Sequence, residues 1–325
     1  MKTHPIFTFV LTLCLIAGCG VVYAATWPFG LVPQTLLGQN PDPAAARSAE
    51  SELRRARSSL SQASSLSARL VETISLFDRN VRAEGRYLQS SNRRIRLELK
   101  LKLGQTSGSL LEVCDGEILW SKQDVGPDTT ITRRNVNQIL DAARQSGAVP
   151  ENMLIADLGL GGLPALLASI ERSFDFTGLK SDRLRDRPVV ILQGQWKPPV
   201  VATLNPGGDP NQLPPYIPDL IRIYLDEETG FPLRIMYLKK IPDRDTLRSL
   251  LTLDFLDPQV GQELPSQEFV FVPPSQPQPI ELTHQYLQQL RPANAGPSPT
   301  APPGGPAAAA PPASAPPGAP PAGGS

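Results

Sequence analysis

The sequence has few of the residues that build metal sites and reactive thiols. Its 325 residues include three cysteines, Cys14, Cys19 and Cys114, and two histidines, His4 and His284. Structural zinc sites and disulfide frameworks both need paired sets of such residues. We therefore expect no metal, no cofactor and no disulfide framework.

The chain also lacks an excess of charge of either sign. Its 31 basic and 31 acidic side chains give a formal net charge of zero. Binding to a nucleic-acid backbone depends on a surplus of Lys and Arg, so we expect no nucleic-acid partner.

Motifs of common enzyme sites are missing as well. The glycines of residues 157–164 lack the Lys-Ser/Thr pair of a phosphate-binding loop, and no Gly-x-Ser-x-Gly elbow occurs. Cys114 with His284 is the one conceivable nucleophile–base pair, but no base lies near Cys114 in the sequence. The sequence therefore predicts a protein that is not an enzyme.

Residues 1–24 have the pattern of an export signal. Lys2 supplies a positive start, and the apolar run of residues 6–18 is too short for a comfortable membrane span. Two cleavage sites compete: IAGC at residues 16–19 resembles a lipobox that makes Cys19 a lipidated N-terminus, whereas Ala24 fits ordinary secretory cleavage. Both predict the periplasm. A lipidated Cys19 followed by Gly20 resembles an outer-membrane anchor.

Composition divides the rest of the chain into three parts. Residues 25–43 are expected to be a linker, residues 44–291 a folded domain, and residues 292–325 a disordered tail. From residue 296 onward the tail contains only Gly, Pro, Ser, Thr and Ala, so it cannot bury enough surface to offset the entropy of ordering. It is either a solvated tail or a spacer of up to about 90 Å that reaches a cell-wall or envelope-protein partner.

The clearest structural signal is the strict alternation of residues 94–103. Ile95, Leu97, Leu99 and Leu101 occupy one face of the expected strand, and charged residues occupy the other. Successive side chains of a strand point to opposite faces, so this pattern indicates one dry and one wet face. Antiparallel sheets allow such an arrangement.

Hairpins and covering helices complete the predicted fold. Asp115-Gly116 and residues 227–230 each mark a hairpin turn between alternating segments. Residues 132–175 form a helical interlude, in which one helix presents an apolar face to the sheet. The prediction is an α+β fold, a curved antiparallel half-barrel covered on its concave apolar face by helices.

The hairpin motif VCDGEILW at residues 113–120 resembles the LolA/LolB-like lipoprotein-carrier superfamily, as do residues 85–87, 93–98 and 229–235. The resemblance spans about residues 44–290. It implies an unclosed barrel whose inner face holds acyl chains beneath a helical lid, and an arginine that locks the lid. Arg94 or Arg96 is the candidate for this arginine.

On this resemblance the ligands are lipid or lipoprotein acyl chains. The residues expected to line the site lie on the alternating strand, the DG hairpin and the lid helix: Ile95, Leu97, Leu99, Leu101, Ile118, Trp120, Leu160, Leu163, Leu166, Leu167 and Ile170. The alternative is a structural or scaffolding envelope lipoprotein with a filled core, which makes its contacts through the Pro-rich loop at residues 197–218 and the tail.

Overall fold

A computed structural model describes residues 31–33, 43–76, 79–103, 106–146, 156–205, 207–209, 213–241 and 246–289. The expected export signal with Cys19 and the expected tail at residues 292–325 lie outside these ranges. Within the segment expected to be a linker, residues 31–33 form a short strand.

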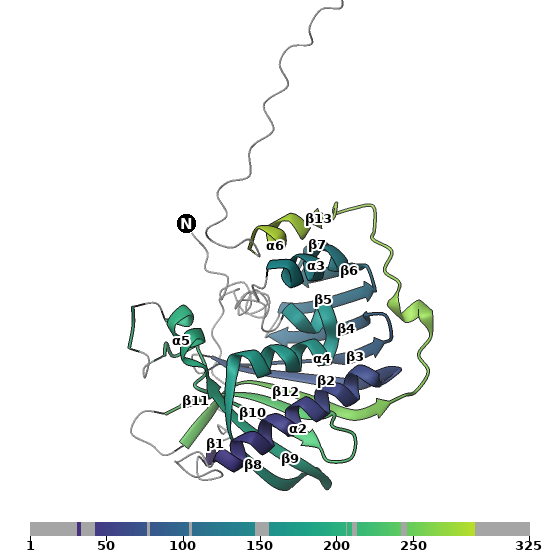
Figure 1. Ribbon diagram of the computed structural model, residues 1–325. Helices are drawn as coiled ribbons and strands as arrows, with labels where there is room; N and C mark the ends of the chain where they lie inside the picture. The colour runs from purple at the N-terminus through teal and green to yellow at the C-terminus, as the bar shows by residue number, and fades with distance from the viewer. Residues whose placement is uncertain are drawn as a thin grey trace, which may run out of the picture.

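One large sheet organises the described residues (Figure 1). It has 13 strands in the order β13-β7-β6-β5-β4-β3-β2-β12-β11-β10-β9-β8, with β1 paired to β12. Neighbours are antiparallel except for β13 and β7. The strands are β1 (Leu31–Pro33), β2 (Ser65–Leu76), β3 (Arg79–Ser90), β4 (Arg94–Leu103), β5 (Thr106–Asp115), β6 (Ile118–Val125), β7 (Asp128–Asn135), β8 (Phe174–Leu184), β9 (Arg187–Trp196), β10 (Leu220–Asp226), β11 (Pro232–Lys240), β12 (Thr246–Val260) and β13 (Ile280–Glu281). The sheet curves without closing, which confirms the predicted half-barrel.

Helices cover one face of this sheet, here called the inner face. Helix α2 (Pro43–Gln62) packs on β8 and β9, and α4 (Ala156–Ser173) packs on α2, β4 and β5 (Figure 1). Helix α3 (Val136–Ser146) lies against β6 and α6 (Thr283–Gln289), and α5 (Pro198–Leu204) follows β9. No helix within the described ranges has both the length and the hydropathy required to cross a bilayer.

The predicted alternation explains why the sheet has a dry inner face. Ile95, Leu97, Leu99 and Leu101 of β4 are all buried on the side of the helices. The register continues this face across the sheet: the residue of β3 that pairs with Leu99 pairs in turn with Leu70 of β2, which pairs with Phe255 of β12. The apolar core therefore lies between the inner face and helices α2 and α4.

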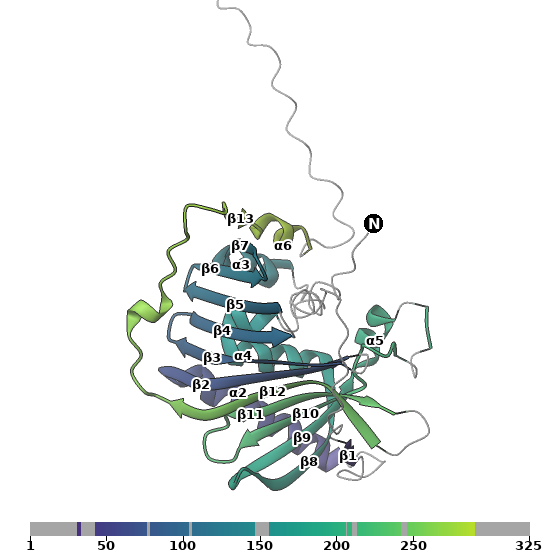
Figure 2. The ribbon, with the colours of Figure 1, turned by 180° about the vertical axis from the view of Figure 1, so that it is seen from behind.

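The opposite, outer face is crossed by the segment that leads from β12 to β13. We call residues 261–279 the strap. Figure 2 shows that it runs beside the turns of the β3–β4 and β5–β6 hairpins. Its 3-10 helix η3 (Ser266–Phe269) contacts β4 and β5 and buries Phe269 beneath the Arg94 guanidinium. The strap thus fastens the outer face by a mixture of apolar and charged contacts.

Both predicted hairpins are confirmed. The first turn joins β5 to β6, and its Asp115 Oδ1 accepts hydrogen bonds from the backbone N–H groups of Glu117 and Ile118, each at 2.8 Å. The second joins β10 to β11, where Gly230 has a φ of +72° and lies so close to Ala56 of α2 that a Cβ would come within 2.9 Å of its Cα. Helix α2 therefore packs directly against the β10–β11 turn, and only glycine leaves room for it at position 230.

Three details of the sequence prediction are wrong. Residues 132–135 belong to strand β7, so the helical interlude begins at Val136. Phe174 begins strand β8, a strand that the sequence analysis missed because its first residues continue the apolar face of α4. The sequence alone predicts a strand at residues 269–272, but Phe269 ends η3 and residues 270–272 continue the strap without strand structure.

Truncating Phe269 should loosen the strap. Because the ring is 1% exposed, Phe269→Ala is expected to lower the free energy of unfolding by roughly 3 kcal/mol. Urea denaturation measures this change. The control is Val272→Ala, at an 80% exposed position of the same segment, which should change the free energy of unfolding by less than about 0.5 kcal/mol. Equal effects of the two substitutions would contradict a packed strap.

Candidate functional site

The inner face is not covered evenly. Side chains beneath the helices, such as Tyr87, Ile95 and Phe255, are fully buried. A contiguous group on β12, β2, β3, β4 and β5 keeps 5 to 8% exposure, and we call it the inner patch: Ile74, Val81, Ala83, Leu97, Leu99, Leu101, Leu110, Leu251 and Leu253. Its apolar surface is therefore almost, but not completely, covered by the protein itself.

The strand register shows that the inner patch is continuous. Leu251 pairs with Ile74, which pairs with Val81 in the first row. In the next rows Ala83 pairs with Leu101, and Leu99 pairs with Leu110. Neighbouring side chains on one sheet face lie within contact distance, so these residues form one apolar surface.

Most of the predicted lining residues lie on the inner side of the sheet. Leu97, Leu99 and Leu101 belong to the inner patch, whereas Ile95 lies under the helices with no exposure. The α4 residues are fully buried in the same core: Leu163, Leu166, Leu167 and Ile170. The side chain of Leu160 lies outside the described residues. A binding role for these residues stays a prediction.

The prediction that Ile118 and Trp120 share this surface is wrong. Leu119, between them, is the residue of β6 that belongs to the core. Trp120 pairs with Val113 and Arg133 on the outer face, where its ring lies 5.6 Å from that of Phe271 in the strap. Because the side chains of a strand alternate, assigning Trp120 to the inner face placed the hairpin one residue out of phase.

The prediction that Arg94 or Arg96 locks the lid is also wrong. Both lie at outer-face positions of β4. The Arg94 guanidinium lies over the ring of Phe269, and Arg96 Nη1 donates a 2.9 Å hydrogen bond to the backbone carbonyl of Glu268. These arginines therefore hold the strap.

The contact that fastens α4 comes instead from Tyr87 and Gln89 on β3. The backbone N–H of Leu163 donates to Tyr87 Oη at 3.0 Å and to Gln89 Oε1 at 3.2 Å. Gly162 interrupts the helix here with a φ of +72°, and a Cβ on it would collide with Gln89 Oε1. The glycines of residues 159–162 were the sequence signal for this contact, but the polar partners are on a distant strand.

The inner face also carries polar side chains, among them Gln89, Glu112 and Arg134. Two more, Glu72 and Tyr237, are buried in its apolar part. Burial raises the pKa of the Glu72 carboxyl from 4.5 to about 8, and no other cause contributes to this shift. The hydroxyl of Tyr237 is buried with no hydrogen-bond partner, and burial raises its pKa as well. Both groups are therefore neutral at pH 7.

The described residues show little preparation for covalent chemistry. Burial raises the pKa of the Cys114 thiol to about 11, so the thiol keeps its proton at neutral pH and is a poor nucleophile. Within the described ranges no group of three or more His, Cys, Asp or Glu residues has the arrangement to hold a metal ion.

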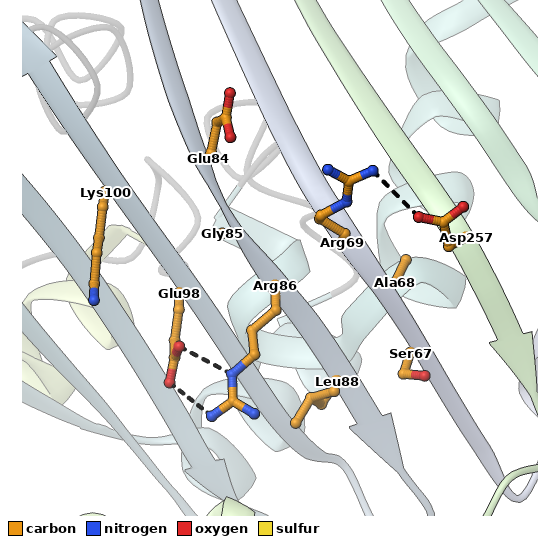
Figure 3. A pocket seen from close by; sticks show the side chains of 10 residues that line it. All are labelled: Ser67, Ala68, Arg69, Glu84, Gly85, Arg86, Leu88, Glu98, Lys100 and Asp257. Atoms are coloured by element: carbon orange, nitrogen blue, oxygen red, sulfur yellow. Dashed lines mark hydrogen bonds and ion pairs between the residues drawn. The ribbon is translucent and has the colours of Figure 1, made fainter.

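A hollow of about 460 Å³ lies on the outer face and is lined mainly by charged residues (Figure 3). Arg86 holds Glu98 through two hydrogen bonds of 2.9 and 3.1 Å, and this contact lowers the pKa of Glu98 to about 2. Arg69 pairs with Asp257 across its rim. Because its charges neutralise one another, this hollow offers no evident site for an apolar or a charged ligand.

No model of a known protein family matches the sequence, and no curated protein matches it. Solved structures do match. The MucA/MucB complex of Pseudomonas aeruginosa is matched at 16% identity and a TM-score of 0.34, over 69% of this chain and 61% of that one. LprF from Mycobacterium bovis is matched at 13% identity and a TM-score of 0.36, over 70% of this chain and 97% of that one.

A third match is a domain from Vibrio parahaemolyticus described as an outer membrane lipoprotein-sorting protein. It is matched at 10% identity and a TM-score of 0.30, over 69% of this chain and 97% of that one. The solved structures thus include the family that the sequence motifs resemble. At these TM-scores the likeness is a loose one of fold.

Removing the Tyr87 hydroxyl should destabilise the helical turn of α4 that begins at Leu163, directly after the interruption at Gly162. Tyr87→Phe takes away one acceptor from the buried Leu163 N–H, so the free energy of unfolding should fall by about 1 to 2 kcal/mol. Hydrogen exchange of the peptide covering residues 156–173 should accelerate. Tyr216→Phe, at a 39% exposed position, is the control, and unchanged exchange in Tyr87→Phe would contradict this role.

Glu72 should make stability depend on pH. Between pH 4.5 and about 8 the unfolded chain releases the Glu72 proton and the folded chain keeps it. The free energy of unfolding of the wild type should therefore fall with rising pH, relative to Glu72→Gln, by up to about 1.4 kcal/mol per pH unit. Urea unfolding at several pH values measures the difference. Parallel pH profiles would show that Glu72 ionises normally in the fold.

Proposed function

We propose that this chain is a non-catalytic protein of the bacterial cell envelope that binds the acyl chains of lipids or lipoproteins on its inner patch. The observation that supports this proposal is the incompletely covered apolar surface formed by the inner-patch residues. Apolar surface that a fold leaves partly uncovered is available to a ligand of the same character.

Acyl burial supplies the affinity in this proposal. Each methylene removed from water contributes about 0.8 kcal/mol, so a chain of moderate length needs no specific partner to bind. The contact of Leu163 with Tyr87 and Gln89 gives α4 a defined hinge at Gly162. A movement at this glycine would widen access to the patch without breaking the sheet.

The place of action in this proposal rests on the N-terminal sequence. Export through residues 1–24 brings the chain to the periplasm, and lipidation of Cys19 would anchor it to the outer membrane. The folded domain at residues 44–291 then works within reach of envelope lipids.

Extraction of the purified protein tests the proposal directly. A Cys19→Ser variant of the full chain, which lacks the proposed lipid anchor, is expressed with its own export signal and purified without detergent. The lipid that organic solvent extracts from it is quantified by mass spectrometry. Lipid at near-stoichiometric amounts supports acyl binding. A lipid-free protein that also fails to bind a neutral fluorescent dye, N-phenylnaphthylamine, would favour the scaffolding alternative with a filled core.

Filling the inner patch should block binding. Ala83 lies between Glu72 and Leu101 in the register, so Ala83→Phe places a ring in the middle of the patch. The dye affinity should fall about tenfold or more, with a loss of stability of about 1 to 3 kcal/mol from overpacking. Fluorescence titration and urea unfolding measure both.

Glu84→Phe is the matched control for this substitution. Glu84 follows Ala83 on the same strand and faces outward, so the added ring should leave dye affinity unchanged. If Ala83→Phe folds and binds the dye as the wild type does, the ligand does not lie on the inner patch.

A further inference from the structure

A second apolar cluster lies on the outer face of the sheet, where β10, β11 and β12 run side by side. We call it the outer cluster, and its members are Leu220, Met236, Leu238 and Leu247. The residues that alternate with them, such as Ile221 and Tyr237, belong to the core on the inner face. Leu238 and Leu247 have no exposed surface. Because one layer of sheet leaves its outer side chains open to solvent, this burial requires a cover.

Arg222 lies within the outer cluster and is itself completely buried. It pairs with Met236 on β11 and with Gln193 on β9. Its Nε and Nη2 atoms donate to Gln193 Oε1 at 3.2 and 2.7 Å, whereas Nη1 is buried without a hydrogen-bond partner. A buried arginine that keeps its charge beside a neutral amide is costly, so the cover should also compensate the guanidinium.

The helices and loops that cover other parts of the sheet are directed elsewhere. Helices α2 and α4 pack against the core of the inner face, and the strap contacts β4 and β5. The loop before β10 is held toward the inner side, because its Pro218 carbonyl accepts a 2.7 Å hydrogen bond from Trp196, whose ring stacks on Phe174 of the core.

Strand β1 brings the N-terminal part of the chain to the edge of the outer cluster. Val32 pairs with Leu247, so the two side chains share the outer face. Strand β2 pairs with the same edge of β12 from Leu251 onward and ends at Leu76. Strands β1 and β2 therefore lie end to end, and the chain that precedes Leu31 has to leave the plane of the sheet.

Residues 25–30, which lie outside the described ranges, have the composition to cover the outer cluster. Their sequence is Ala-Thr-Trp-Pro-Phe-Gly, and Trp27 and Phe29 are the aromatic residues of the segment 25–42. Residues 34–42 lead instead to α2 on the inner face. An aromatic ring packs well on aliphatic side chains, and its π face attracts a desolvated guanidinium. The outer cluster and Arg222 present both.

We propose that residues 25–30 dock on the outer cluster and place the ring of Trp27 or Phe29 over the Arg222 guanidinium. This docking is independent of the acyl-binding proposal. Combined with the proposed lipidation it sets a short tether, because the chain from Cys19 to Ala25 spans at most about 22 Å. An anchor on Cys19 would then hold the outer face of β10 and β11 next to the membrane.

Cysteine labelling of the full chain tests the docking. Met236→Cys is introduced into the Cys19→Ser background, and its reaction with a maleimide is followed by peptide mass spectrometry. Val272→Cys, at an 80% exposed position, gives the rate of a freely accessible thiol. The native Cys114 is completely buried in the core and reports whether the whole fold has opened.

The docked segment should protect the outer cluster from the reagent. Met236→Cys is expected to react at least about tenfold more slowly than Val272→Cys. Trp27→Ser combined with Phe29→Ser should remove this protection while Cys114 stays unlabelled. The matched control is Leu36→Ser combined with Leu37→Ser, which removes two apolar residues from the segment on the other side of β1 and should leave the labelling rate unchanged.

Trp27→Leu combined with Phe29→Leu tests the contact with Arg222. The leucines can cover apolar surface but have no π face for the guanidinium, so the protection of Met236→Cys should fall by roughly fivefold. Protection equal to that of the aromatic pair would overturn the contact between ring and guanidinium.

Three results would overturn the docking itself. The first is labelling of Met236→Cys that does not change when Trp27 and Phe29 are replaced by serine, or that changes only together with labelling of Cys114. The second is faster labelling caused by the substitutions at Leu36 and Leu37 alone. The third is a mature chain that begins after residue 30, which mass spectrometry of the purified protein detects.

Discussion

The structure depends on the alternation of side chains along each strand between a face that meets helices and a face that meets water. Strand β4 has Ile95, Leu97, Leu99 and Leu101 on one side and charged residues on the other, and this pattern fixes its register with β3 and β5. A slip of one residue would expose the leucines and bury the charges. An antiparallel sheet allows a strand such as β4 to pack apolar side chains on one face and to carry charged side chains on the other.

The two faces have divided roles. On the outer face Arg86, Arg96 and Glu98 form ion pairs that also reach Glu268 of the strap, so charge and packing together fasten the chain from β12 to β13. On the inner face helices α2 and α4 leave part of the apolar surface incompletely covered. Burial is thus most complete under the helices and the strap, whereas the inner-patch side chains keep 5 to 8% exposure.

Sequence patterns predicted the parts of this arrangement that depend on near neighbours. The Asp115-Gly116 turn, the alternation of β4 and the apolar stripe of α4 are local signals, and each is confirmed. Trp120 was assigned to the wrong face because the short strand that follows the turn carries apolar residues at three successive positions, so its phase is ambiguous. Arg94 and Arg96 were assigned to the lid because nothing local to them indicates that the strap, about 170 residues away, returns to cover them.

The sequence by itself determined the class of fold, because hydrophobic periodicity and turn chemistry are written within short windows of the chain. Only the tertiary structure decided which polar groups meet and which remain without partners. Tyr87 and Gln89 cap the start of a helix more than 70 residues away, and Glu72 is neutral because strands distant in sequence enclose it. Burial and hydrogen-bond satisfaction depend on all the neighbours of a group, and most of those neighbours come from long-range pairing.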